Sequence, residues 1–363
     1  MKRILIVFLL GLGFACGTAT AQQSCTQTLR LANSSYDQGR LHELPGLLKG
    51  CLQSSDGFTK AEKVTAYKLL VLSYIYLEEP KQADSTMILL LEADHFFEPN
   101  QALDPGEFIG LYNTFRNKPV FNVGIKLGIN FTLPSVSSNY YIGNNSLGAG
   151  TYTPSLGIQG GFVFEKGLFQ NWKNQKWKKF TLAPEILFVS RAISYDNTPF
   201  TNYLGSNPDT NTLLKVSESQ GWLDLNVLVQ YQLKPESKLN PYVALGPGVS
   251  YLLSSSSSPT TTRGNTGNVV SGPPVDLTNS YKKLVYSITA STGIKYRFGG
   301  LYATLEIRYQ YGLSNLVNPD KRYNKEFSFD YVGGLNDYSI QNLQVMAGAV
   351  VPIFKPQKLK RKK

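Results

Sequence analysis

Eight segments in the C-terminal two-thirds of the chain alternate apolar and polar residues with a period of two. In the first segment, Val123, Ile125 and Leu127 share one face, while Gly124 and Lys126 share the other. Successive side chains of a strand point to opposite faces, so each segment has an apolar face and a face of glycines and scattered charges. Transmembrane barrels turn the first face to lipid and the second to the lumen, and a tilted strand needs about 9 to 11 residues to cross. The pattern predicts an all-β transmembrane barrel of eight antiparallel strands over residues 119–354.

The connections between these segments alternate between long and short. The third long stretch reads SSSSSPTTTRGNTGN, the low-complexity composition of a solvated loop, whereas only Gly299 and Gly300 separate the sixth segment from the seventh. One short turn, residues 167–179, is longer than usual and basic, and Pro247 predicts a bulge or bend in the fifth strand. Outer-membrane barrels place short turns in the periplasm. We therefore expect an outer-membrane protein with both termini in the periplasm.

The N-terminus has the features of a secretory signal peptide over residues 1–21. Lys2 and Arg3 precede an apolar run, and Ala19-Thr20-Ala21 supplies a cleavage site. Cys16 leaves a lipoprotein open as an alternative. If cleavage follows Ala21, two cysteines remain, and two thiols in an exported chain usually pair. We expect a disulfide between Cys25 and Cys51.

The period changes to helical spacing between the signal peptide and the barrel. Apolar residues recur at intervals of three and four, as in Leu44, Leu47 and Leu48. Residues 22–118 are therefore predicted to form a small all-α periplasmic domain, with Asp104 capping its last helix. Its paired helices resemble tetratricopeptide repeats over two units. Such a domain either docks a partner or caps the barrel mouth.

Charge and histidine content restrict the chemistry of the chain. The net charge is +11, and residues 355–363, KPQKLKRKK, form a basic tail. In the periplasm this tail meets anionic lipid head groups or acidic cell-wall polymer, or is a solvated aid to assembly, so no nucleic-acid partner is expected. Both histidines, His42 and His95, lie in the helical segment, which excludes a histidine-dependent hydrolase on the strands. No metal or other cofactor is expected.

The charges on the polar faces of the strands have mixed signs. An eight-stranded barrel fills its interior with side chains. Compensating charges there most simply form ion pairs that plug the barrel, and a catalytic carboxylate pair is the alternative, since burial without pairing is costly. The side chains predicted to face the lumen are Lys126, Glu165, Glu185, Arg191, Asp224, Lys295, Arg297, Glu306 and Arg308.

The barrel resembles a known family over residues 121–354. FNVGIKLGINF and NPYVALGPGVSYLL are similar to segments of the PorT-like outer-membrane β-barrel family of Bacteroidota. The closing stretch is similar to the C-terminal signal that the barrel assembly machinery reads, here with Gly348, Val351, Ile353 and Phe354. The resemblance implies a role in protein secretion across the outer membrane or in gliding.

These observations predict a non-enzymatic membrane scaffold. The barrel anchors the chain in outer-membrane lipid, and the helical domain recruits a periplasmic partner such as a secretion or envelope component. Two alternatives remain: a channel for small solutes or ions, and surface adhesion through aromatic residues of the outer loops, namely Tyr140, Tyr141, Phe200 and Tyr203.

Overall fold

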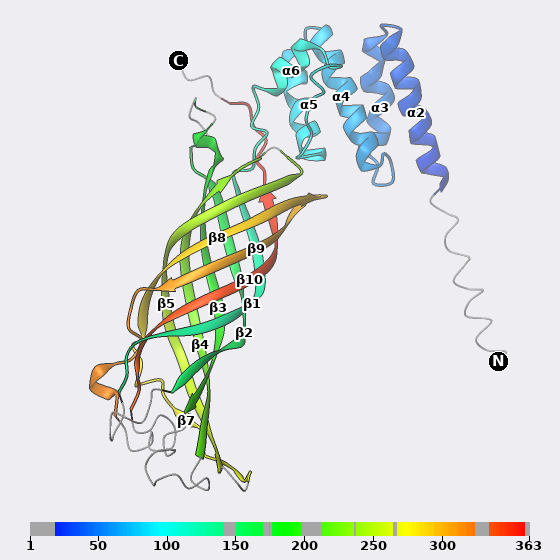
Figure 1. Cartoon of the computed structure of the whole chain (residues 1–363). Coiled ribbons are helices and arrows are strands. Elements are labelled where there is room, and N and C mark those ends of the chain that lie inside the picture. Colours follow the sequence, from blue (N-terminus) through cyan, green and yellow to red (C-terminus); the bar gives the residue numbers. More distant parts are fainter. Residues whose placement is uncertain are drawn as a thin grey trace, which may run out of the picture. The chain divides into compact units, whose positions relative to one another are not determined.

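The computed structural model describes residues 19–140, 150–169, 174, 176–197, 212–235, 237–263, 267–323 and 334–359. The chain divides into two compact units (Figure 1). One is Val120–Ile353, and the other combines Met1–Pro119 with Phe354–Lys363. The predicted signal peptide, residues 1–21, lies almost entirely outside the described residues.

The larger unit is a closed barrel of eight long antiparallel strands, as the alternation predicted. Its strands follow one another around the barrel, and pairing of β1 with β10 and of β4 with β5 completes the circle. Closure leaves no long strand with an unpaired edge. The strands are β1 (Phe121–Ser138), β2 (Thr151–Gly167), β3 (Phe180–Asn197), β4 (Thr212–Gln232), β5 (Leu239–Arg263), β8 (Leu284–Phe298), β9 (Leu301–Gly312) and β10 (Asp337–Ile353), with the short strands β6 (Val269–Ser271) and β7 (Val275–Asp276) beside β5.

The outer surface of the barrel is apolar. Leu127, Ile158 and Phe162 are 65%, 67% and 70% exposed. Apolar side chains on the outside of a closed barrel are suited to contact with the hydrocarbon chains of a bilayer. The turn between β8 and β9 needs only Gly299 and Gly300, and Gly299 adopts a φ of +58° that L side chains rarely adopt.

The strands are longer than the 9 to 11 residues that crossing a bilayer requires. The serine-rich stretch predicted as a loop accounts for the two longest strands, because residues 254–263 continue β5 and pair with residues 212–221 of β4. Prediction of a solvated loop there was wrong. Ser255 and Ser257 are buried on the inner face, so backbone pairing with β4 overrides the low strand propensity of this composition.

At Pro247 the pairing of β5 with β4 is interrupted, since Gly246 and Pro247 have no partner in β4, but no register shift occurs there. The register of β5 with β8 continues unchanged through Pro247, and a register shift occurs instead between Gly221 and Trp222 of β4. There Gly221 pairs with Ser254 and Trp222 with Leu252, which leaves one extra residue in β5. This bulge changes the inward-facing positions of β5 from even to odd numbers.

The smaller unit is an array of antiparallel helices (Figure 1): α2 (Ala19–Asp37), α3 (Leu44–Gln53), α4 (Lys60–Tyr76), α5 (Pro80–Ala93) and α6 (Gly106–Tyr112), with a 3-10 turn η1 (Leu41–Glu43). One apolar cluster joins α2, α3 and α4 around Leu44, Leu48 and Ala66, and a second joins α4, α5 and α6 around Met87 and Phe108. No helix in the described ranges is long and apolar enough to cross a membrane.

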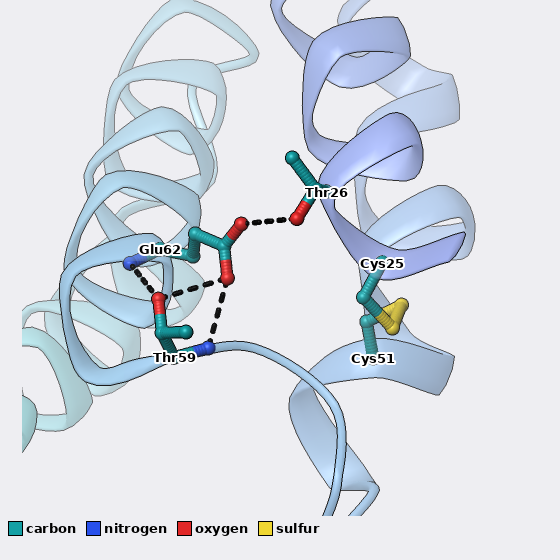
Figure 2. Close-up of a disulfide and its surroundings, with 5 residues drawn as sticks. All are labelled: Cys25, Thr26, Cys51, Thr59 and Glu62. Carbon is teal, nitrogen blue, oxygen red and sulfur yellow. Dashed lines mark hydrogen bonds between the residues drawn. A yellow bond between two sulfur atoms is a disulfide. The ribbon is translucent and has the colours of Figure 1, made fainter. Parts of the chain in front are cut away.

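Local hydrogen bonds fix the start of α4 (Figure 2). Thr59 caps the helix, its hydroxyl accepting from the Glu62 backbone while the Glu62 carboxylate accepts from the Thr59 backbone N–H at 2.9 Å. Thr26 of α2 donates to the same carboxylate at 2.6 Å. The hydroxyl of Thr26 and the groups of Thr59 hold the pKa of Glu62 below its usual value.

The cap predicted for the last helix is displaced by one residue. Pro105, not Asp104, occupies the N-cap position of α6, and it has no side-chain hydrogen bond to the helix. Asp104 instead accepts from the backbone N–H of Asn100 and forms an ion pair with Lys68 at 2.5 Å. The carboxylate therefore links the loop before α6 to α4.

Candidate functional site

Eight of the nine charges predicted to face the lumen are buried inside the barrel. Each is no more than 3% exposed: Lys126, Glu165, Glu185, Arg191, Asp224, Lys295, Glu306 and Arg308. Arg297 is the exception, because it lies one residue from the end of β8 and is half-buried. Its backbone N–H donates to Lys238 at the same end of the barrel.

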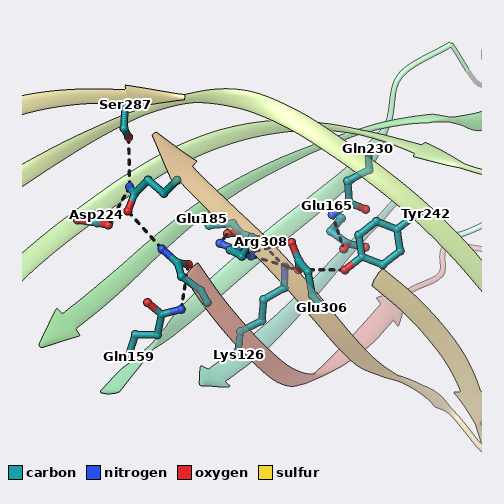
Figure 3. A network of polar contacts seen from close by, with 12 residues as sticks. Lys126, Gln159, Glu165, Glu185, Asp224, Gln230, Tyr242, Ser287, Glu306 and Arg308 are labelled. Carbon is teal, nitrogen blue, oxygen red and sulfur yellow. Dashed lines mark hydrogen bonds and ion pairs between the residues drawn. The ribbon is translucent and has the colours of Figure 1, made fainter. Parts of the chain in front are cut away.

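Four of these side chains form one network in the middle of the barrel (Figure 3). Lys126 donates to Glu185 at 2.5 Å and to Glu306 at 2.8 Å. Arg308 donates to both oxygens of Glu185, at 2.8 and 3.1 Å, and also pairs with Glu306 at 3.1 Å. Tyr242 donates its hydroxyl proton to Glu306 at 3.0 Å. Two cations therefore share two carboxylates, and each carboxylate touches both cations.

A second ion pair lies toward the short-turn end of the barrel. Lys295 donates to Glu165 at 2.6 Å and to Gln230 at 2.9 Å. Asn122 donates to the second oxygen of Glu165 at 3.0 Å. These contacts join β1, β2, β4 and β8 across the interior, so the pair ties strands that are not neighbours in the barrel wall.

A third ion pair lies toward the long-loop end. Arg191 donates to Asp224 at 2.7 Å and to Gln310 at 3.2 Å. Gln310 in turn donates to Asp224 and Ser287 and accepts from Gln344, to which Gln159 donates (Figure 3). The amide side chains of Gln310, Gln344 and Gln159 thus extend the hydrogen-bond network beyond the ion pair of Arg191 and Asp224.

The charges balance within each of the three groups. Lys126 and Arg308 face two carboxylates, and each of the other two cations faces one. Charges buried without a partner are strongly destabilising, whereas matched, hydrogen-bonded pairs are tolerated. The arrangement is therefore that of a paired polar filling, in which each of the four carboxylates contacts at least one cation.

The long-loop half of the interior holds buried apolar side chains and one further buried carboxylate, Glu218, which were not predicted from the sequence. The Glu218 carboxylate accepts hydrogen bonds from Gln220, Ser255 and Tyr281. Val216, Trp222 and Leu252 are fully buried on the inner faces of β4 and β5. They pack with residues of the connecting segments that fold inward, including Leu277 after β7 and Leu316 after β9. These apolar side chains occupy the interior on the long-loop side of the ion pairs.

The two fillings meet around Arg191. Its guanidinium lies 4.9 Å from the ring centre of Trp222, a cation–π contact between the polar and the apolar half. A cavity of about 10 Å³ beside Arg191, Ser250 and Gln310 has room for about one water molecule.

Other predicted site residues are placed as follows. Cys25 and Cys51 form a disulfide that joins α2 to α3 (Figure 2). Gly348, Val351 and Ile353 belong to β10, but Phe354 lies in the helical unit with the tail, which differs from the predicted boundary after Phe354. The reason is that its ring stacks on that of His95 at 4.9 Å.

Of the four loop aromatics predicted for adhesion, only Tyr140 lies within the described residues. Tyr141, Phe200 and Tyr203 lie outside the described residues. Tyr140 lies 3.3 Å beneath the Arg322 guanidinium, so its ring is covered by a cation. Within the described ranges, no group of three or more histidine, cysteine, aspartate or glutamate side chains is arranged to hold a metal ion.

A closed antiparallel barrel with an apolar outer face and a filled interior defines a transmembrane β-barrel protein. The family model of the outer membrane protein beta-barrel domain matches residues 114–318, more than half of the chain. The chain belongs to this family and is an outer-membrane β-barrel protein. No curated protein sequence matches it.

Solved barrels of other outer-membrane proteins are similar to this chain at low identity. Neisserial surface protein A is 13% identical, with 64% of this chain and 97% of that chain covered and a TM-score of 0.30. The outer membrane protein OprG from Pseudomonas aeruginosa is 14% identical, with 66% and 98% covered and a TM-score of 0.35.

Proposed function

We propose that this chain is a non-enzymatic outer-membrane anchor whose helical unit docks a protein partner in the periplasm. The observation that carries the proposal is the filled barrel interior. Balanced ion pairs in one half and packed apolar side chains in the other favour an anchoring role over conduction or catalysis.

The connections between strands support a periplasmic position for the helical unit. The barrel begins at Phe121 and ends at Ile353, which are paired with each other at the end that carries the Gly299–Gly300 turn. Short turns of outer-membrane barrels lie in the periplasm. Both segments that lead to the helical unit leave from this end, which supports a periplasmic helical unit.

The helical unit has the properties of a docking module. It has its own apolar clusters and a disulfide, so its shape does not depend on the barrel interior. It also exposes large apolar side chains, among them Tyr76 at 50% and Leu103 at 80%. The resemblance to tetratricopeptide repeats and to the PorT-like family makes a secretion or envelope component the class of partner that we propose.

Site-specific photo-crosslinking in native membranes tests the proposal. A photoreactive residue replaces Tyr76 or Leu103 in the helical unit, and Leu127, 65% exposed on the outside of the barrel, provides the matched control. We expect one periplasmic protein to be captured from the helical positions and not from Leu127. Helical positions that yield no protein adduct would contradict the docking role.

A further inference from the structure

The end of the chain is bound to the helical unit. After β10 ends at Ile353, residues 354–359 run along α5 and the segments on either side of α6. We call this stretch the tail segment. The sequence predicted a basic tail that meets anionic lipid or cell-wall polymer, or is solvated, whereas in the structure the tail segment contacts the helical unit.

Two backbone hydrogen bonds hold the tail segment as a short strand. The N–H of Arg116 donates to the carbonyl of Gln357 at 2.9 Å, and the N–H of Leu359 donates to the carbonyl of Thr114 at 2.8 Å. They form an antiparallel bridge between Phe115 and Lys358. Backbone pairing of this kind supplies affinity for an extended peptide irrespective of its sequence, and side-chain pockets add selectivity.

Side chains at both ends of the tail segment give the seat its selectivity. The ring of Phe354 stacks on His95 at 4.9 Å and meets Phe96 edge-on at 5.3 Å. His95 is held in place by a 2.7 Å hydrogen bond from its Nδ1 to the Leu91 carbonyl. An aromatic side chain therefore fits between two rings at the end of α5.

The other end of the tail segment is held by charge. Lys358 donates to Oδ2 of Asp84 at 2.5 Å and lies 6.0 Å from the ring centre of Phe115. Oδ1 of Asp84 is buried and accepts no hydrogen bond from the described residues. The Asp84 carboxylate thus selects a cation four residues after the aromatic side chain and keeps one acceptor unused.

We propose that Asp84, His95, Phe96 and the backbone of residues 114–116 form a recognition site for extended peptides with an aromatic residue followed four positions later by lysine, and that the tail segment occupies this site in cis. A partner segment of the same chemistry enters by displacing the tail. The inference rests on the proposed docking function and names the part of the helical unit that performs it.

Peptide binding to the full-length chain in detergent tests this inference. The probe is a fluorescent peptide with the sequence of residues 354–363, measured by polarisation. A tethered segment competes at a high effective concentration, so the wild-type chain should bind the probe weakly. Lys358→Glu should release the tail and tighten probe binding about tenfold or more, because a charge-assisted hydrogen bond is lost only in cis. Lys355→Glu, an exposed position with the same change in charge, should bind as the wild type does.

A charge exchange gives the second readout. In a Lys358→Ala chain, whose tail carries no charge at this position, adding Asp84→Lys should weaken binding of the wild-type probe, and a probe with glutamate in place of Lys358 should bind this double variant better than the wild-type probe does. Equal probe affinity in the wild-type and Lys358→Glu chains, or no effect of Asp84→Lys, would overturn the inference. If the probe fails while crosslinking at Tyr76 or Leu103 still captures a protein, this site is wrong and the docking function stands.

Discussion

The two halves of the barrel interior are filled by different kinds of side chain. Toward the short turns, the inward positions hold ion pairs such as Lys126 with Glu185 and Glu306. Toward the long loops, the inward positions of the same strands hold mainly apolar side chains such as Val216 and Trp222, with the hydrogen-bonded side chains of Glu218 and Gln220 between them on β4. Strand alternation fixes which residues face inward but not the chemistry of their side chains.

The polar half faces the stronger constraint, because every charge in it needs its partner. Removing a carboxylate leaves cations buried inside a wall that lipid surrounds. The apolar side chains of the long-loop half need only volume to be filled, and part of that volume is filled by residues of the connecting segments, such as Leu277 and Leu316. Loss of a polar partner should therefore cost more than loss of an apolar side chain, and the following predictions test that difference.

Glu185→Leu should have the largest effect. It removes the carboxylate shared by Lys126 and Arg308, and breaking a buried pair costs about 3–5 kcal/mol of unfolding free energy. Urea titration of the barrel in lipid vesicles measures the loss. Glu185→Gln keeps an acceptor and should lose less, and a Glu185→Leu barrel as stable as the wild type would refute the importance of the pairing.

Leu252→Ala should have the next largest effect, about 3 kcal/mol, because it opens a cavity in the apolar filling. The same titration applies. Leu245→Ala on the same strand is the matched control, since Leu245 is 58% exposed on the outer face and lipid fills the space left there. Its loss should not exceed about 2 kcal/mol. Equal losses at the two positions would mean that the long-loop half is not tightly packed.

Tyr242→Phe should cost about 1 kcal/mol, because it removes one hydrogen bond to Glu306 and leaves both ion pairs of that carboxylate in place. Comparison with Glu185→Leu separates the contribution of hydrogen bonding from that of charge balance. A loss as large as that of Glu185→Leu would show that the hydroxyl, rather than the cations, controls the stability of the network.

Glu62→Gln should have the smallest effect, about 0.5 kcal/mol, because Glu62 is an exposed carboxylate at the start of α4. The pKa of Glu62 is lowered in the folded state by Thr26 and Thr59, so its contribution is present above the unfolded pKa and is lost as the pH falls through the folded pKa. Thermal unfolding of the helical unit followed from pH 7 to pH 3 should lose this acid-sensitive component in the variant. An unchanged pH profile would contradict the assignment.

The outer face and the positions of the charges could be predicted from the sequence. Leu127 and Ile158 belong to strands in which apolar residues alternate with polar or small ones. A period of two places all the apolar residues of such a strand on the same face. The buried charges followed from the same period. Their individual partners did not, because pairing across the lumen depends on the stagger of strands far apart in the chain.

The apolar filling could not be predicted from alternation alone. Its signal is the run Ile186-Leu187-Phe188-Val189, where both faces of β3 are apolar. Such a run also fits a strand of a soluble protein that is buried on both faces. The bulge opposite Gly221 had no sequence signal of its own. The packing of Phe354 on His95 and Phe96 could not be predicted, because the sequence of a basic tail does not indicate which helix it contacts.

Single-channel recording in planar lipid bilayers tests the central claim most directly. Purified wild-type protein should insert without producing steady conductance, because ion pairs and apolar side chains fill the two halves of the lumen in series. Glu185→Leu should remain silent as well, since the apolar half is unchanged. Reproducible ohmic steps from the wild-type protein would contradict the account and make the chain a channel.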